Sequence, residues 1–245
     1  MIHATAVRVA GPPAGIVDVW CVPLDAPELP HDALVATLAP WERQRAARMR
    51  VGGGAWAAAH GARRAILASY LEVPASALQF CAGDSGKPRL AGISGLEFSF
   101  ARTDGLALLA VACGCEVGVD VERENDRTDI EVVAREFLPP AEAAALERTP
   151  PEGRRSAFFS AWTRHEARLK LHGEGLTGST SGCGRGRAPE APVSVRGLTL
   201  PPGFRGAVAL ANEDGNWTVR IREFQFNRDA VMHAALQTAG HPASA

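Results

Sequence analysis

Residues 96–122 read LEFSFARTDGLALLAVACGCEVGVDVE and predict three successive β-strands. We expect the strands at 96–100, 106–113 and 116–122, because short apolar runs separated by turn residues are typical of strands. Asp104 and Gly105 between the first two runs are a hairpin signal. The centre of the chain is therefore predicted to be a sheet.

The sequence on either side of this sheet adds helices and further strands. N-terminal to it we expect a strand at 16–24, helices at 38–51 and 55–71, a short strand at 78–81 and a turn at 83–88. C-terminal to it we expect helices at 129–137, 140–147 and 153–172, a glycine-rich loop at 173–187, and strands at 193–200, 205–211 and 216–226. Both halves then hold a helix packed on antiparallel strands, which predicts an α+β protein of two similar lobes. The predicted boundaries are 1–115 for the N-terminal lobe, 116–228 for the C-terminal lobe and 229–245 for a frayed tail.

Composition excludes several classes of protein. The 245 residues weigh 25.8 kDa, with 46% hydrophobic and 22% charged residues, which is ordinary for a globular protein and not for a disordered one. A net charge of −1 argues against a nucleic-acid binder. No apolar run is long enough to span a membrane, and the N-terminus lacks a signal-peptide layout. The five scattered cysteines do not form a disulfide framework, so we expect a reduced, cytoplasmic protein.

Two carboxylates lie on the third strand of the predicted sheet. Side chains alternate along a strand, so Asp120 and Glu122 share one face while Val119 and Val121 share the other. Carboxylates roughly 7 Å apart repel each other unless a cation lies between them. Such hard oxygen ligands suit Mg²⁺. The alternative is a strand end that runs into solvent and is neutralised by a neighbouring arginine.

The predicted helix 153–172 carries a second set of candidates. Trp162, Glu166 and Lys170 are spaced i, i+4 and i+8, and therefore share one helix face. Next to a metal, the carboxylate could act as a base and the ammonium could hold a phosphate. The alternative is an ordinary helix-stabilising Glu–Lys pair. His165 and Glu166 do not form a zinc motif, because Leu169 stands where a second histidine would be needed.

Lysine is rare in this chain. Of 26 basic residues only Lys87 and Lys170 are lysines, which indicates sites where a compact ammonium is required. Lys87 lies in a Gly-Lys-Pro turn suited to holding a phosphate. The arginines cluster in residues 41–64, which carry a net charge of +5, whereas residues 116–152 carry −7. Either run could be a solvated helix face or a site for an oppositely charged ligand.

In this order and spacing the motifs resemble the 4′-phosphopantetheinyl transferases, specifically the larger, two-lobed surfactin-type class. The matching blocks are LAPWERQR (38–45), SYLEV (69–73), GKP (86–88), VGVDVE (117–122), FL (137–138) and FFSAWTRHEARLKLHGEGL (158–176). An acid pair on a strand, followed some forty residues later by W-T-x-x-E-A-x-x-K and G-x-G-L, is a specific combination.

The resemblance implies transfer of the phosphopantetheine arm of coenzyme A onto a serine of an apo acyl- or peptidyl-carrier protein, with release of 3′,5′-ADP. By this resemblance Mg²⁺ would be held by Asp120, Glu122 and Glu166, the serine proton would go to Glu166, and phosphates would contact Lys170, Lys87 and Arg45. Carrier proteins of this kind are acidic, so the arginine-rich segment 41–64 could also serve docking. A chain that holds both lobes can form the site as a monomer.

The chain departs from the family pattern at several positions. The usual F-N-L-S-H-S reads FSFART at 98–103, which places Ala101 and Arg102 where a serine and a histidine commonly contact coenzyme A. An arginine can still bind phosphate, and bidentately. His165 replaces a lysine, and Ala55 replaces a basic residue. Two alternatives therefore stay open: a homologue that binds coenzyme A or a carrier protein without transfer, and an enzyme with other Mg²⁺-dependent chemistry on the same fold.

Overall fold

The computed structural model describes residues 10–26, 31–83, 86–173, 192–212 and 216–224. The predicted glycine-rich loop, apart from Gly173, and the predicted tail at 229–245 lie outside these residues, as does Cys183. The helices are α1 (His31–Thr37), α2 (Pro40–Arg48), α3 (Gly53–Leu71), η1 (Ala75–Ala77), α4 (Ile130–Phe137), α5 (Pro140–Glu147) and α6 (Pro151–His172). The strands are β1 (Ile16–Pro23), β2 (Phe80–Ala82), β3 (Pro88–Leu90), β4 (Leu96–Thr103), β5 (Leu106–Cys113), β6 (Val117–Arg123), β7 (Val193–Gly197), β8 (Phe204–Ala211) and β9 (Thr218–Glu223).

The strands form two main sheets and one hairpin. The first sheet has the order β4-β5-β1-β9, the second has the order β6-β8-β7, and β2 pairs with β3. In the first sheet β5 pairs with both β4 and β1, and in the second sheet β8 pairs with both β7 and β6. The predicted α+β class is confirmed.

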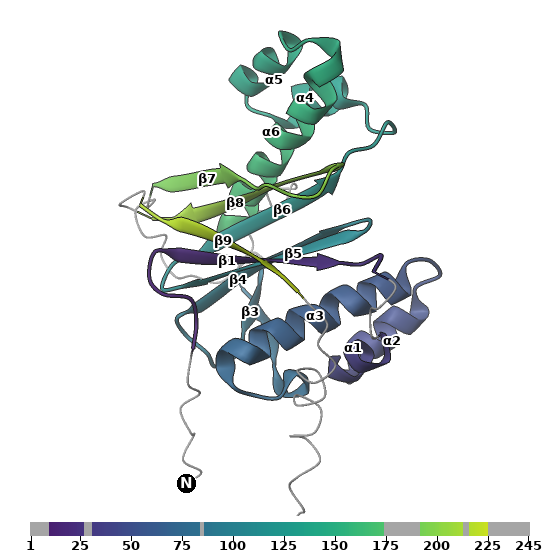
Figure 1. Ribbon diagram of the computed structural model, residues 1–245, viewed down its shortest axis with the longest axis vertical. Helices are drawn as coiled ribbons and strands as arrows, with labels where there is room; N and C mark the ends of the chain where they lie inside the picture. The colour runs from purple at the N-terminus through teal and green to yellow at the C-terminus, as the bar shows by residue number, and fades with distance from the viewer. Residues whose placement is uncertain (1–9, 27–30, 84–85, 174–191, 213–215, 225–245) are drawn as a thin grey trace, which may run out of the picture.

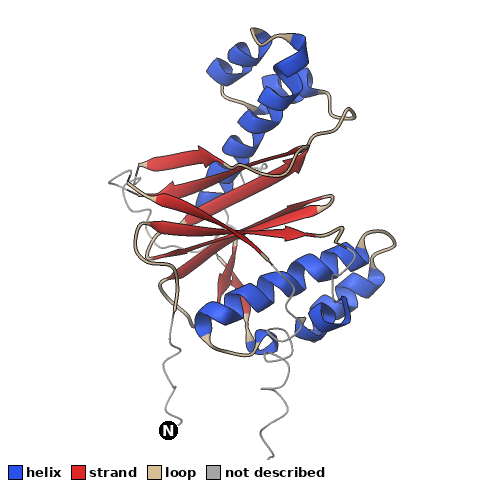
Figure 2. Cartoon of the chain, in the orientation of Figure 1, coloured by secondary structure: helices blue, strands red, loops and turns tan. Residues whose placement is uncertain are grey.

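The two sheets and two long helices stack in four layers, as Figure 1 shows. From one side of the molecule to the other the order is α6, the β6-β8-β7 sheet, the β4-β5-β1-β9 sheet and α3, which the colouring of Figure 2 makes plain. Apolar residues of β1, β5, β6 and β8 fill the space between the sheets. The outer face of the first sheet packs on α3, and that of the second sheet on α6.

The predicted alternation along residues 117–122 is confirmed. Val119 and Val121 are buried in the core between the sheets. Asp120 and Glu122 consequently project from the opposite face of β6, on which α6 lies. The sequence pattern thus placed both carboxylates on the correct side of the sheet.

Three features differ from the prediction. Helix α1 and strand β3 were not expected; the Pro88–Leu90 segment follows the predicted turn and pairs with β2. Strand β9 pairs with β1 in parallel, so the first sheet is mixed and not antiparallel throughout. This pairing joins residues some 200 positions apart, and no local sequence signal specifies it. None of the helices among the described residues is long and apolar enough to cross a membrane.

A buried polar cluster joins β9 to the rest of the first sheet. The Asp18 carboxylate, fully buried on β1, accepts hydrogen bonds from Arg220 of β9 and from the Tyr70 hydroxyl of α3. Burial alone would raise the pKa of Asp18, but these bonds and the charges of Arg220 and Arg222 outweigh it and lower the pKa. Asp18 therefore stays ionised and ties three elements together.

Helix α6 approaches β6 unusually closely at Gly118. A Cβ atom added there would lie 2.0 Å from the carbonyl oxygen of Ala167 and 2.5 Å from the backbone nitrogen of Leu171. Both atoms belong to the backbone of α6 and cannot rotate away. Gly118 thus allows the contact that brings the polar face of α6 onto Asp120.

Replacing Gly118 by alanine should push α6 away from β6 and lower the free energy of unfolding by about 3 kcal/mol. Gly197→Ala, in the same sheet, is the matched control, because a Cβ there meets nothing within 4 Å; its stability should change by no more than about 0.5 kcal/mol. Urea unfolding followed by far-UV circular dichroism measures both. Equal stability of the two variants would show that the close contact of α6 with Gly118 does not contribute to stability.

Candidate functional site

The candidate site forms where one face of α6 lies over the outer face of β6. The Lys170 ammonium donates to Asp120 Oδ1 at 2.6 Å, and the Trp162 side chain hydrogen-bonds Glu122. Glu166, one helical turn from each of these α6 residues, lies close enough for the Asp120 charge to raise its pKa. The predicted i, i+4, i+8 face of α6 therefore meets the predicted acid pair of β6.

Burial raises the pKa of all three carboxylates in the cluster, and the charge of Asp120 adds to the increase for the other two. Burial and then the charge of Asp120 raise the pKa of Glu122 to about 7, against the opposing effect of Lys170. Burial is also the main cause of the raised pKa values of Asp120 and Glu166. A group of buried acids with such pKa values is typical of a functional site and costs folding stability.

The donor chemistry of this cluster fits a hard divalent cation. Asp120 Oδ2 and Glu166 Oε1 are buried and have no hydrogen-bond partner among the residues that the structure describes. In the described part of the chain, however, no three His, Cys, Asp or Glu side chains gather closely enough to hold a metal ion. The ammonium of Lys170 neutralises Asp120 instead. The residues thus fit Mg²⁺ by type and burial, with Lys170 in contact with one of the expected ligands.

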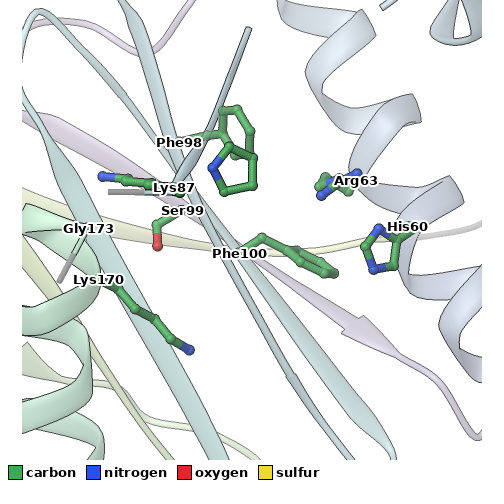
Figure 3. A pocket seen from close by; sticks show the side chains of 10 residues that line it. His60, Arg63, Lys87, Phe98, Ser99, Phe100, Lys170 and Gly173 are labelled. Carbon is green, nitrogen blue, oxygen red and sulfur yellow. The ribbon is translucent and has the colours of Figure 1, made fainter. Parts of the chain in front are cut away.

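A cavity of about 360 Å³ lies beside this cluster. Figure 3 shows His60 and Arg63 of α3 on one side, Lys170 of α6 and Gly173 just after this helix on the other, and Phe98, Ser99 and Phe100 of β4 between them. The cavity therefore spans the two halves of the chain. The strands meet there as well, because the Val119 amide of β6 donates to the Ser99 hydroxyl of β4 at 3.0 Å.

Lys87 lines the same cavity but is already engaged. Its ammonium donates to the carbonyl oxygens of Val117 at 2.8 Å and Leu171 at 3.2 Å, and so ties the start of β6 to the last turn of α6. Burial lowers the pKa of Lys87. An ammonium group has three hydrogens, so one is left for a ligand. The predicted phosphate contact of Lys87 stays a prediction.

Arg45 lies in a second cavity, also of about 360 Å³, next to the first. Both are lined by His60, Arg63, Gly86 and Pro88. The Arg45 guanidinium lies over the Trp56 ring, 5.5 Å from its centroid, and Arg63 lies over Phe80 at 4.5 Å. The structure therefore gathers guanidinium groups at the α3 end of the cavities, away from the acid cluster.

His60 is a site residue that the sequence analysis missed. Its ring stacks on Trp56 at 3.8 Å between centroids, and its buried Nδ1 has no hydrogen-bond partner. Burial, followed by the charges of Arg63, Arg102, Arg45 and Arg64, lowers its pKa to about 2. Burial is thus the main reason that the imidazole is neutral, and the nearby arginine charges add to it. A polar residue inside the alanine-rich run 55–62, one helical turn after Trp56, was the available signal.

Arg102 belongs to the same positive region, since its charge acts on His60, and its side chain is exposed. His165 lies beside Trp162, outside the cavity lining. Burial lowers the pKa of His165. Of the candidates, Asp120, Glu122, Glu166 and Lys170 come together, whereas Arg45 and Arg102 lie at the opposite end of the site.

The raised pKa of Glu122 predicts a specific pH dependence of stability. Between pH 4.5 and about 7, Glu122 keeps a proton in the folded protein but has lost it in the unfolded chain. The free energy of unfolding therefore falls as pH rises through this window and levels off above it. Relative to wild type, Glu122→Gln should therefore gain up to about 3 kcal/mol of unfolding free energy between pH 5 and pH 8.

Urea unfolding at the two pH values measures this difference. Glu136→Gln, which alters an exposed carboxylate on α4, should follow the wild-type pH profile. A Glu122→Gln profile parallel to wild type would mean that Glu122 ionises normally.

Comparisons with known proteins identify the family to which the chain is similar. A sequence model of the 4′-phosphopantetheinyl transferase superfamily matches residues 116–185, which include β6 and α6. The chain is 36% identical to the 4′-phosphopantetheinyl transferase HetI of Nostoc sp. over 165 residues, which cover 65% of this chain and 70% of HetI. It is 29% identical over 172 residues to the putative 4′-phosphopantetheinyl transferase slr0495 of Synechocystis sp., covering 65% and 66%. It is also 31% identical over 91 residues to AcpT of Salmonella typhi, a 4′-phosphopantetheinyl transferase, covering 37% and 47%.

The match to HetI covers 165 residues, more than the superfamily segment 116–185, and that segment includes the residues that form the acid cluster. The chain therefore belongs to the 4′-phosphopantetheinyl transferase superfamily and is an enzyme of the transferase class.

Proposed function

We propose that the enzyme transfers the 4′-phosphopantetheine arm of coenzyme A to a serine of an apo acyl- or peptidyl-carrier protein. The serine hydroxyl oxygen attacks the phosphorus that bears the pantetheine. The bond between this phosphorus and the bridging oxygen of the pyrophosphate breaks, and 3′,5′-ADP leaves. The serine loses its proton, and the carrier protein gains a phosphodiester-linked arm.

The observation that carries this proposal is the charge arrangement across the cavities. Buried carboxylates and Lys170 lie at the α6 end, whereas Arg45, Arg63 and the cation-surrounded His60 lie at the α3 end. Phosphoryl transfer depends mainly on positioning and on neutralising phosphate charge. Coenzyme A carries a pyrophosphate and a separate phosphate, so one charged region would bind at the α6 end and the other at the α3 end of the cavities.

At the α6 end, Asp120, Glu122 and Glu166 would hold Mg²⁺. When bound, Mg²⁺ supplies positive charge that stabilises the pyrophosphate as charge develops on the leaving group. Glu166 is the proposed acceptor of the serine proton, because its raised pKa brings it closer to that of an effective base near neutral pH. Lys170, on the wall of the cavity, would contact the transferred phosphate.

Arg45 and Arg102 at the α3 end, together with Lys87 nearer to α6, are the proposed contacts of the remaining phosphate of coenzyme A. Arg63 is held by the buried Glu42 at 3.1 Å and keeps its unpartnered Nε in the interior. His60, neutral and unpartnered at Nδ1, adds a polar atom to the same wall.

Helix α2 is the proposed docking surface for the acidic carrier protein. Its one acid, Glu42, is fully buried against Arg63 and Arg64, so it does not offset the exposed arginines. These are Arg43, Arg45 and Arg48, with Arg50 just beyond the helix. A positive surface beside the cavities would steer a negatively charged partner toward the site.

We also propose that the fold consists of two related lobes. Each half of the chain begins with a strand, β1 or β6, that is followed by two short helices and a long helix. A later antiparallel pair of strands, β4 and β5 or β7 and β8, extends the sheet of that first strand. The two outer layers, α3 and α6, are the corresponding long helices (Figure 1). The cavity then lies between the lobes, and one chain suffices to form it.

The acid cluster provides the direct test of the reaction. Asp120→Asn and Glu166→Gln should each reduce transfer at least about a thousandfold while leaving the protein folded, because both remove a proposed metal ligand. The assay incubates the enzyme with coenzyme A, Mg²⁺ and a panel of apo carrier proteins, and measures intact masses. Wild type should add one phosphopantetheine arm, and EDTA should abolish the addition.

Unchanged turnover of either variant would remove the metal assignment. No mass gain on any carrier, with coenzyme A still bound, would favour a binding protein without transfer activity.

The α3 end can be tested separately through coenzyme A binding. Arg45→Ala should weaken coenzyme A binding about tenfold, because it removes a charge-assisted phosphate contact, and should leave kcat nearly unchanged. Arg48→Ala, on the same helix, is the control and should not affect coenzyme A binding. Titration calorimetry with coenzyme A alone measures both. Equal affinity of the two variants would place the phosphate elsewhere.

A further inference from the structure

The ion pair between Lys170 and Asp120 lies where the proposed metal would bind. The Nζ–Oδ1 distance is 2.6 Å, and the Asp120 side chain is only 5% exposed, whereas that of Lys170 is 34% exposed. A carboxylate buried to this extent requires a compensating charge. In the absence of a metal, Lys170 provides it.

The remaining carboxylate oxygens of the cluster are not neutralised by Lys170. Within the described residues, Asp120 Oδ2 and Glu166 Oε1 are buried and have no hydrogen-bond partner. One ammonium therefore leaves two carboxylate oxygens unsatisfied. A divalent cation could satisfy them, but Lys170 would repel it at the distance of a direct contact.

Lys170 has an alternative position available. It lines the cavity as well as contacting Asp120, and Figure 3 shows its side chain extending from α6 into the space beside β4. An anionic group in the cavity could therefore attract the ammonium away from Asp120. The stem of the lysine is long and flexible, which favours such a movement.

We propose that Lys170 is a tethered counterion that occupies the metal position until a phosphate-bearing ligand draws it into the cavity. Metal binding and phosphate binding are then thermodynamically coupled: each ligand raises the affinity for the other, because both favour the state in which the ion pair is open. The enzyme alone binds Mg²⁺ weakly and binds it well only with its co-substrate. This inference rests on the proposed metal site but requires no transfer reaction.

Metal affinity without catalysis tests the proposal. Titration calorimetry of the full chain with Mg²⁺ alone should show binding by Lys170→Met at least about tenfold tighter than by wild type, because the methionine keeps a long stem and removes the charge. Lys170→Arg keeps the charge and should stay weak. Arg168→Met, two residues away and paired with Glu142, is the matched control and should match wild type. Asp120→Asn combined with Lys170→Met should lose the binding.

Coupling is measured by repeating the titration with coenzyme A bound and no carrier protein present. Coenzyme A should tighten Mg²⁺ binding to wild type at least about fivefold more than to Lys170→Met.

The rarity of lysine allows a direct observation of the movement. With ¹³C-lysine labelling the full chain gives side-chain εCH₂ signals only from Lys87 and Lys170, because the sequence contains no other lysine. The spectrum of Lys170→Met assigns both. Saturation with Mg²⁺ and coenzyme A should shift the Lys170 signal more than the Lys87 signal.

Equal Mg²⁺ affinity of wild type and Lys170→Met would overturn the proposal, even if transfer is observed. So would a Lys170 signal that is unmoved at saturation. Absence of Mg²⁺ binding by every variant would overturn both this inference and the proposed metal site. Tighter Mg²⁺ binding by Lys170→Met, together with a wild-type enzyme that transfers the arm to no carrier protein, would support the counterion role of Lys170 and reject the proposed function.

Discussion

The close contact between α6 and β6 at Gly118 is the constraint on which the site depends. A side chain at this position would overlap the backbone of Ala167 and Leu171, so only glycine allows the helix to lie on the strand. Because β6 alternates, the residue two positions later, Asp120, faces the same helix, and Lys170 is adjacent to the contact on α6. Lys87 reinforces the arrangement by donating to both Val117 and Leu171. Packing thus determines where the charges meet.

Burying these carboxylates together lowers the free energy of unfolding, and a bound cation would raise it again. Burial raises the pKa values of Asp120, Glu122 and Glu166, and the charge of Asp120 adds to the increase for Glu122 and Glu166. One lysine compensates only part of this. Elsewhere in the protein the same problem is solved completely: the fully buried Glu42 is paired with Arg63 and Arg64, the latter at 2.5 Å. The contrast between a satisfied acid and three partly satisfied ones marks the α6 cluster as a place for a ligand.

The sequence predicted those features that depend on local periodicity. The alternation of residues 117–122 placed Asp120 and Glu122 on one face, and the four-residue spacing of Trp162, Glu166 and Lys170 placed these on one helix face. It could not predict that β9 pairs in parallel with β1, because that register depends on Arg220 reaching Asp18 across the whole chain. His60 was missed for a similar reason. Its role follows from arginines on α2, α3 and β4, which only the fold brings around it.

The two lysines illustrate why residue type alone did not determine their roles. Both ammonium groups lie on the wall of one cavity, and both are bound to protein oxygens, yet their partners differ. Lys87 donates to backbone carbonyls, which are neutral and fixed, so leaving them would expose unpaired acceptors in the interior. Lys170 donates to a carboxylate that a metal ion could neutralise equally well. A ligand can therefore replace the partner of Lys170 without leaving an uncompensated charge, whereas Lys87 has no such exchange available. The ammonium group of Lys87 thus makes a fixed structural contact, whereas that of Lys170 is an exchangeable counterion.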